Sequence, residues 1–225
     1  MKRAALIVFL ALVPVTAAAQ THSGTLESGD ATRDGGQYVD SYEFQTEESQ
    51  RVTVTMTGDF DTYLIVESPS GVQSINDDFA PGTSQVDVLA GEAGTWRALA
   101  SAYGGSETGA YEIVIALGAT GTMEVQQGRL DTSDTMSIKG EYYDTHTIQV
   151  SPDVEFFVEL VSLGFDGYLS VRSPSGEMWR NDDTGSTSLA RVGPLRGADG
   201  DWTVYATSNS NEEVGAYDLR VTRFE

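Results

Sequence analysis

The residues of this chain best suited to chemistry are acidic, and they occur as two matching sets. The sets are Asp40, Asp61, Asp77 and Asp78 in the first half, and Asp144, Asp166, Asp182 and Asp183 in the second. Ca²⁺ takes about six to eight oxygen ligands, which carboxylates from neighbouring loops can supply. The sets therefore suggest a calcium site in each half. The competing interpretation is that these side chains form Asx-turns with the local backbone, because the spacing is not that of an EF-hand loop.

Groups suited to catalysis are scarce. The chain has two histidines and no cysteine, which excludes thiol catalysis, thiolate metal sites and disulfides. His22 lies near the start of the expected mature chain, and His146 stands where the first half has Tyr42, which favours a structural role. Ser68 and Ser173 belong to Ser-Pro-Ser-Gly turns and not to a Gly-x-Ser-x-Gly nucleophile elbow. We therefore expect no enzyme activity, and a hydrolase is the least favoured alternative.

Four aromatic residues are candidates for ligand binding. They are Trp179, Tyr205, Phe79 and Tyr103. The first two stand where the first half has Ser74 and Leu99, so they are special to the second half; the last two lie in loops of the first half. Exposed rings can stack on sugars or clamp a peptide strand. The alternative is that these rings cover the edge of a small core or pack between the two halves.

The elements that position these residues belong to a chain that repeats itself. Residues 60–71 and 76–78 match residues 165–176 and 181–183 at a constant offset of 165 − 60 = 105. Further collinear matches are Leu26 with Leu130, Tyr38 with Tyr142, Trp96 with Trp202, and Tyr111 with Tyr217. Chance does not produce this many matches in order. We therefore predict two homologous domains, residues 20–118 and 119–225, each near the commonest domain size.

Alternating apolar and polar residues predict strands throughout both halves. Residues 51–56 alternate in this way, as do the stretches that begin at Trp96 and Trp202. Pro- and Gly-rich turns separate the strands, and neither half has a helix-length amphipathic pattern. The sequence therefore predicts an all-β fold: two tandem jelly-roll-like antiparallel β-sandwich domains of about eight short strands each. A barrel is the less favoured alternative.

The order of these motifs resembles the bacterial pre-peptidase C-terminal domain. Both halves contain Phe-Asp-x-Tyr-Leu-x-Val-x-Ser-Pro-x-Gly, Asn-Asp-Asp, Gly-x-Trp and Gly-Ala-Tyr, so the resemblance covers almost the entire mature chain. It implies a jelly-roll-like sandwich that is usually non-catalytic and is found attached to secreted peptidases and other exported hydrolases. Its implied roles are secretion, surface attachment or substrate binding, with calcium bound in some relatives. Within these 225 residues we expect no peptidase domain.

The first nineteen residues have the pattern of a secretory signal peptide. A basic start is followed by an apolar run over residues 4–15 and an A-x-A end, which predicts cleavage after Ala19. The run is shorter than the ~20 residues that span a bilayer. No other segment is apolar enough to span, so we expect no membrane span in the mature chain and an exported protein, either periplasmic or secreted.

The charge balance narrows the range of partners. The chain has 34 acidic and 13 basic side chains, for a formal net charge of −21. Nucleic-acid binding needs clustered Lys and Arg, and anionic lipid headgroups repel such a chain. We therefore expect a non-catalytic binding or accessory module for a protein or polysaccharide outside the cytoplasm. The alternative function is a calcium-stabilised structural protein of the periplasm.

Overall fold

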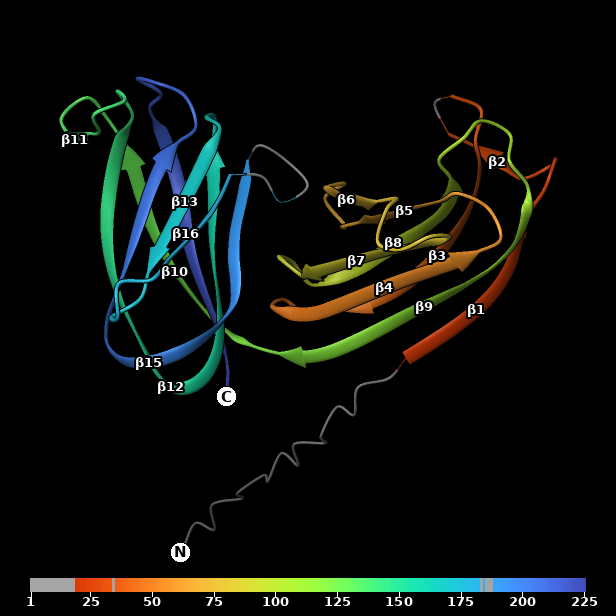
Figure 1. The fold of residues 1–225 in the computed structure, drawn as a ribbon, viewed down its shortest axis with the longest axis horizontal. Coiled ribbons are helices and arrows are strands. Elements are labelled where there is room, and N and C mark those ends of the chain that lie inside the picture. The colour runs from red at the N-terminus through yellow and green to blue at the C-terminus, as the bar shows by residue number, and fades with distance from the viewer. Residues whose placement is uncertain (1–18, 34, 183, 185–187) are drawn as a thin grey trace, which may run out of the picture.

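The computed structural model describes residues 19–33, 35–182, 184 and 188–225. The predicted signal peptide lies outside the described residues, apart from Ala19. The described residues form sixteen strands, and none of them is helical (Figure 1). Every strand pair is antiparallel, so the predicted all-β fold class is confirmed. Within this part of the chain, no helix is long and apolar enough to cross a membrane.

The N-terminal half is a sandwich of two sheets. One sheet has the order β1 (Ala19–Leu26), β9 (Gly109–Thr120), β4 (Gln50–Gly58) and β7 (Thr83–Leu89). The other has the order β2 (Ala31–Thr32), β3 (Tyr38–Thr46), β8 (Gly94–Ala102), β5 (Thr62–Glu67) and β6 (Gln73–Asn76). Apart from the two-residue β2, the eight strands in chain order are arranged 1-8-3-6 and 2-7-4-5. This is the strand order of a jelly roll.

The C-terminal half repeats this arrangement with fewer, longer strands. They are β10 (Thr122–Leu130), β11 (Thr135–Met136), β12 (Tyr142–Leu163), β13 (Gly167–Arg172), β14 (Met178–Asn181), β15 (Leu189–Ser208) and β16 (Gly215–Phe224). The two long strands, β12 and β15, bend at one end of this half (Figure 1). Their pairing register shifts there, and the two ends of each strand pair with different neighbours in one continuous seven-stranded sheet. Counting those ends separately restores the eight jelly-roll strands.

Each half has its own hydrophobic core. One buried cluster is drawn from residues 26–115 around Trp96, and a second from residues 130–221 around Trp202. The alternation predicted for residues 51–56 is present, since Val52, Val54 and Met56 are fully buried and the residues between them are not. Two-residue periodicity places these side chains on the inner face of the sandwich.

A small set of contacts joins the halves. The guanidinium of Arg51 forms an ion pair with Glu155 and lies 4.1 Å from the ring centre of Phe224. Arg191 forms a 2.7 Å ion pair with Glu159 of its own half, and it donates a 3.2 Å hydrogen bond to the Leu89 carbonyl of the other half. Side chains of both halves also line a hollow of about 360 Å³ next to this bond.

Candidate binding face

In the N-terminal half, the structure assigns Asp40 to an internal hydrogen-bond chain. The Tyr111 hydroxyl donates to the Asp40 carboxylate at 2.5 Å. The Tyr42 hydroxyl lies 2.7 Å from the Tyr111 hydroxyl. Because the single proton of Tyr111 goes to Asp40, Tyr42 is the donor in that second bond. Burial raises the pKa of Tyr111, and the Asp40 carboxylate raises it further.

The C-terminal half repeats this chain with a histidine in place of the second tyrosine. The Tyr217 hydroxyl donates to Asp144 at 2.6 Å, and Nε2 of His146 lies 2.7 Å from the same hydroxyl. Since the Tyr217 hydroxyl already donates its hydrogen to Asp144, Nε2 of His146 must carry a hydrogen and donate it to the Tyr217 oxygen. Burial lowers the pKa of His146, while the Asp144 charge acts in the opposite direction. A nitrogen that donates in this way cannot act as a general base towards Tyr217, so the geometry fits a structural histidine.

The Asn-Asp-Asp segments tie neighbouring strands together. Oδ1 of Asn76 accepts the backbone N–H of Gln85 at 3.1 Å. Oδ1 of Asn181 accepts the backbone N–H of Arg191 at 3.2 Å and the Thr184 hydroxyl at 3.0 Å. The two backbone bonds span 9 and 10 residues, so they link successive strands and are not the local bonds of Asx-turns.

The other predicted metal ligands are not brought together into a cation site. The backbone carbonyls of Asp61 and Asp166 accept the N–H groups of Tyr103 and Asn209 across the facing loops. Asp77, Asp78 and Asp182 follow the asparagines, and Asp183 lies outside the described residues. Among the described residues, no three histidine or carboxylate side chains gather closely enough to hold a metal ion. Asp183 is not among the described residues, and calcium binding by the two sets stays a prediction.

The aromatic candidates occupy different settings. Trp179 packs against the core of the C-terminal half, its ring centre 5.8 Å from that of Trp202 in a stacked arrangement. Phe79 and Tyr103 are each 58% exposed in loops of the N-terminal half. Tyr103 lies 6.1 Å from the ring of Tyr63. Trp179 therefore covers the edge of the core, as the alternative interpretation expected.

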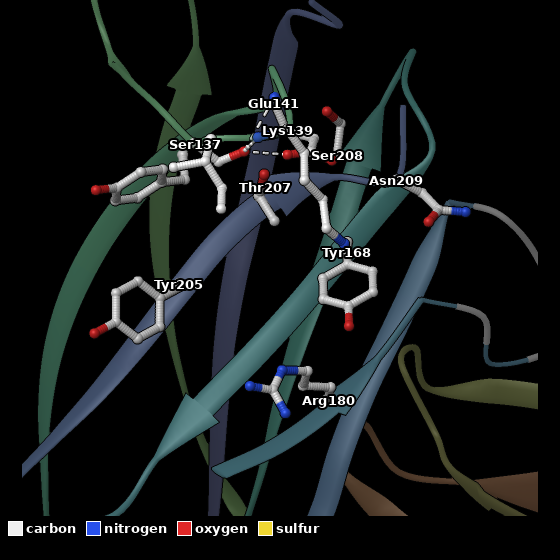
Figure 2. Close-up of a pocket in the computed structure, with 11 residues that line it drawn as sticks. Ser137, Lys139, Glu141, Tyr168, Arg180, Tyr205, Thr207, Ser208 and Asn209 are labelled. Carbon is white, nitrogen blue, oxygen red and sulfur yellow. Dashed lines mark hydrogen bonds between the residues drawn. The ribbon is translucent and has the colours of Figure 1, made fainter. Parts of the chain in front are cut away.

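Tyr205 lines an open hollow of about 380 Å³ on the outer face of the C-terminal half (Figure 2). Tyr143 and Tyr168 line it as well, and we call these three residues the tyrosine face. Tyr143 lies on β12, Tyr205 on β15 and Tyr168 on β13, and these three strands are neighbours in one sheet. Tyr143 and Tyr168 are both in register with Thr207 of β15, the strand that carries Tyr205 two residues away. Residues paired across strands, and residues two apart on one strand, share a face of the sheet.

Two cationic side chains also line this hollow. Arg180 lies on β14 and lines the hollow. Ser170 of β13 pairs with Arg180 on one side and with Tyr205 on the other, so Arg180 and Tyr205 share a face of the sheet. Lys139 lies in the tight loop that joins β11 to β12. In Figure 2 its side chain reaches from this loop towards Tyr168, and Arg180 lies beyond the rings of Tyr168 and Tyr205.

Hydrogen bonds hold the loop of Lys139 in place. The backbone N–H of Lys139 donates to the Ser137 hydroxyl oxygen at 3.0 Å, and the Gly140 carbonyl accepts the N–H of Glu212 at 3.1 Å. The Ser137 hydroxyl donates to the Glu141 carboxylate, which lowers the pKa of Glu141 and keeps it ionised. Glu141 is the one carboxylate among the residues that line the hollow.

The N-terminal half has the same sheet positions but different side chains. The equivalent residues by strand register are Val39 for Tyr143, Leu99 for Tyr205, Ile75 for Arg180 and Tyr63 for Tyr168. The shared tyrosine is covered there, because the guanidinium of Arg33 lies 4.0 Å from the centre of the Tyr63 ring. Ser137 holds the Arg33 position in the second half and is too short to reach the ring. Within the described residues, no aromatic or cationic group stacks on Tyr168 in this way.

Sequence reasoning found Tyr205 but missed four other residues that line this hollow. They are Tyr143, Tyr168, Arg180 and Lys139. A signal was present, since Tyr143 and Arg180 replace aliphatic residues of the first half at outward positions of the strands. Reading the differences between the two copies along the outer face, and not only the shared residues, would have found them.

Comparison with known proteins does not identify a relative of this chain. No family model and no curated protein matches it. Solved structures that match include the major capsid protein P2 of bacteriophage PM2, at 8% identity and a TM-score of 0.28, covering 92% of this chain and 98% of that one. The PBSX exported protein XepA matches at 11% identity and a TM-score of 0.27, covering 95% and 90%. The STIV MCP matches at 11% identity and a TM-score of 0.25, covering 91% and 96%. Likenesses this weak carry no argument about function.

Proposed function

We propose that this chain is an exported, non-catalytic protein of two β-sandwich domains, and that the tyrosine face of its C-terminal half binds a polysaccharide. The observation that carries the proposal is the open hollow lined by Tyr143, Tyr168 and Tyr205. The same sheet face in the N-terminal half has Val39 and Leu99 in place of two of these tyrosines.

The chemistry of the hollow suits a sugar chain. A pyranose ring has an apolar C–H face that packs against an aromatic ring, while its hydroxyl groups need hydrogen-bond partners around the rim. The tyrosine face supplies the rings, and Thr207 and Asn209 supply polar groups among the lining residues. An open hollow on the outside of a sheet also lets a long polymer enter and leave on either side.

The lining residues favour binding over hydrolysis. Glycoside hydrolysis typically uses two carboxyl groups that flank the scissile bond. Glu141 is the one carboxylate among the described residues that line the hollow, and it accepts a hydrogen bond from the Ser137 hydroxyl. The two histidines of the chain do not line this hollow in the described structure. These observations support a role that leaves the polymer intact.

The experiment uses the N-terminal half as a template for the variants. Tyr205→Leu and Tyr143→Val place on the tyrosine face the side chains that the other half has at the same positions, so the fold should tolerate them. In affinity electrophoresis through gels that contain soluble polysaccharides, each variant should bind a recognised polymer about 5- to 10-fold more weakly, the equivalent of ~1 kcal/mol for one stacking ring.

Leu99→Val in the N-terminal half is the matched control, and it should leave the mobility unchanged. Failure of the unaltered protein to be retarded by any neutral, carboxylated or sulfated polysaccharide would refute the proposal. Equal retardation of the unaltered protein and both tyrosine variants would also refute it.

Export has its own test. The proposal rests on residues 1–19, whose pattern predicts cleavage after Ala19. Expression of the full chain in a Gram-negative host, followed by osmotic shock, should release a protein whose first residue is Gln20. An uncleaved protein that stays with the cytoplasmic fraction would contradict export.

A further inference from the structure

The two cations of the hollow stand out in a chain this acidic. The formal net charge is −21, and Lys139 is one of only two lysines in the sequence, the other being Lys2. From the placement of Lys139 and Arg180 in the lining of this hollow, on either side of Tyr168, we infer that the polymer bound there is an acidic polysaccharide, with carboxylate or sulfate groups. This inference rests on the proposed function and adds the chemical class of the ligand.

Neither cation forms an ion pair within the part of the chain that the structure describes. Arg180 and Lys139 are both exposed. By contrast, Arg51, Arg97 and Arg191 each pair with a glutamate. Two cations and one ionised carboxylate, Glu141, give the described lining residues a formal charge of 2 − 1 = +1.

The two side chains differ in how they bind an anion. The planar guanidinium of Arg180 can donate two parallel hydrogen bonds to one carboxylate or sulfate group, whereas the Lys139 ammonium acts as a compact point charge. Tyr168 lies between them (Figure 2). A sugar residue stacked on the Tyr168 ring would therefore place anionic groups of the polysaccharide near a cation on either side.

The charge of the whole protein makes this recognition local. A chain with a net charge of −21 repels polyanions at long range. At an ionic strength of about 0.15 M the Debye length is ~8 Å, so distant carboxylates are screened while groups in the hollow still act on a bound anion. Retention of a polyanion by this protein would therefore not come from non-specific charge attraction.

Pairs of polymers that differ only in charge provide the test. De-esterified pectin is compared with highly methyl-esterified pectin, and dextran sulfate with dextran, by isothermal titration calorimetry of the full mature protein. EDTA in every buffer removes calcium that could bridge two carboxylates. We expect the charged member of at least one pair to bind at least about tenfold more tightly, and the pair that shows the effect identifies the anion as carboxylate or sulfate.

Variants tie the preference to the two cations. Arg180→Ile places the Ile75 side chain of the other half at this position, and Lys139→Gln removes the ammonium. Each should weaken binding of the charged polymer about 3- to 10-fold and leave the uncharged polymer unaffected, whereas Tyr205→Leu should weaken both. Arg129→Gln makes the same change of charge on β10, outside the hollow, and should have no effect.

The outcomes separate this inference from the proposed function. Equal affinity for charged and uncharged polymers, with Tyr205→Leu still harmful, would overturn the acidic ligand and leave polysaccharide binding standing. Charged-polymer binding that survives both Arg180→Ile and Lys139→Gln would also overturn the inference. If no polymer binds the unaltered protein, both the inference and the proposed function fail.

Discussion

The hydroxyl of Tyr217 donates a 2.6 Å hydrogen bond to the carboxylate of Asp144 inside the C-terminal half. Tyr111 and Asp40 form the same pair in the N-terminal half at 2.5 Å. In both halves the aspartate that appeared suited to a calcium ion instead accepts a hydrogen bond from the core tyrosine of the last strand. Two of the repeated aspartates are thereby assigned to holding the sandwich together.

Loss of either tyrosine hydroxyl should destabilise the protein. Tyr217→Phe leaves the Asp144 carboxylate without its donor, and Tyr111→Phe does the same to Asp40. We expect each variant to lower the free energy of unfolding by about 1–3 kcal/mol, because the acceptor is charged. The two effects should add in the double variant, since the pairs lie in separate cores. Urea denaturation followed by tryptophan fluorescence measures this, and an unchanged midpoint in both single variants would contradict it.

Gly128 and Gly24 make room for these tyrosines. A Cβ atom built on Gly128 would lie 2.2 Å from Cζ of Tyr217, and one on Gly24 would lie 2.3 Å from Cζ of Tyr111. Gly128→Ala should therefore push the ring out of position and lower the free energy of unfolding by about 1–3 kcal/mol. Gly105→Ala is the control, since nothing lies within 4 Å of its added Cβ. Thermal melting that shows equal stability for the two variants would rule out this close packing.

The stability of the C-terminal half should depend on pH through His146. Burial lowers its pKa in the folded protein below the ordinary histidine value of about 6.5, so the unfolded chain binds a proton more readily. This contribution to stability is present above about pH 6.5 and is lost as the pH falls through the lower folded pKa. His146→Tyr restores the side chain that the N-terminal half has at this place, Tyr42.

The variant should lose less stability than the unaltered protein between pH 7.5 and pH 5.5. Urea denaturation at several pH values within that window gives the two slopes to compare. Identical slopes would mean that His146 does not contribute to the acid sensitivity, whatever the carboxylates contribute at lower pH.

If the repeated aspartates serve the fold and do not bind a cation, calcium should leave the melting temperature unchanged. Asp40 and Asp144 already accept tyrosine hydroxyls, and Asn76 and Asn181 bond to the backbone of the neighbouring strand. A ligand that binds only the folded state raises the melting temperature, so differential scanning calorimetry after EDTA treatment, with and without millimolar calcium, is a direct test. A rise that Asp182→Asn abolishes would instead locate a calcium site at the 181–184 loop and support the hypothesis drawn from the sequence.

Much of the fold could be predicted because its causes are local or repeated in the chain. The alternation that buries Val52, Val54 and Met56 is legible in six residues, since successive side chains of a strand point to opposite faces. The jelly-roll expectation followed from about eight such strands in each copy, and the strand order of the structure agrees with it. The separate folding of residues 20–118 and 119–225 stays a prediction.

The roles of individual side chains were decided by tertiary structure. The sequence could place Asp144 and Tyr217 at equivalent positions in two copies, but their hydrogen bond joins residues 73 apart in the chain. Likewise, Tyr143, Tyr168 and Tyr205 come together only because β12, β15 and β13 are neighbours in one sheet. Periodicity determines which face of its own strand a residue occupies. The pairing order of distant strands determines which other residues share that face, and the pairing order depends on packing of the whole core.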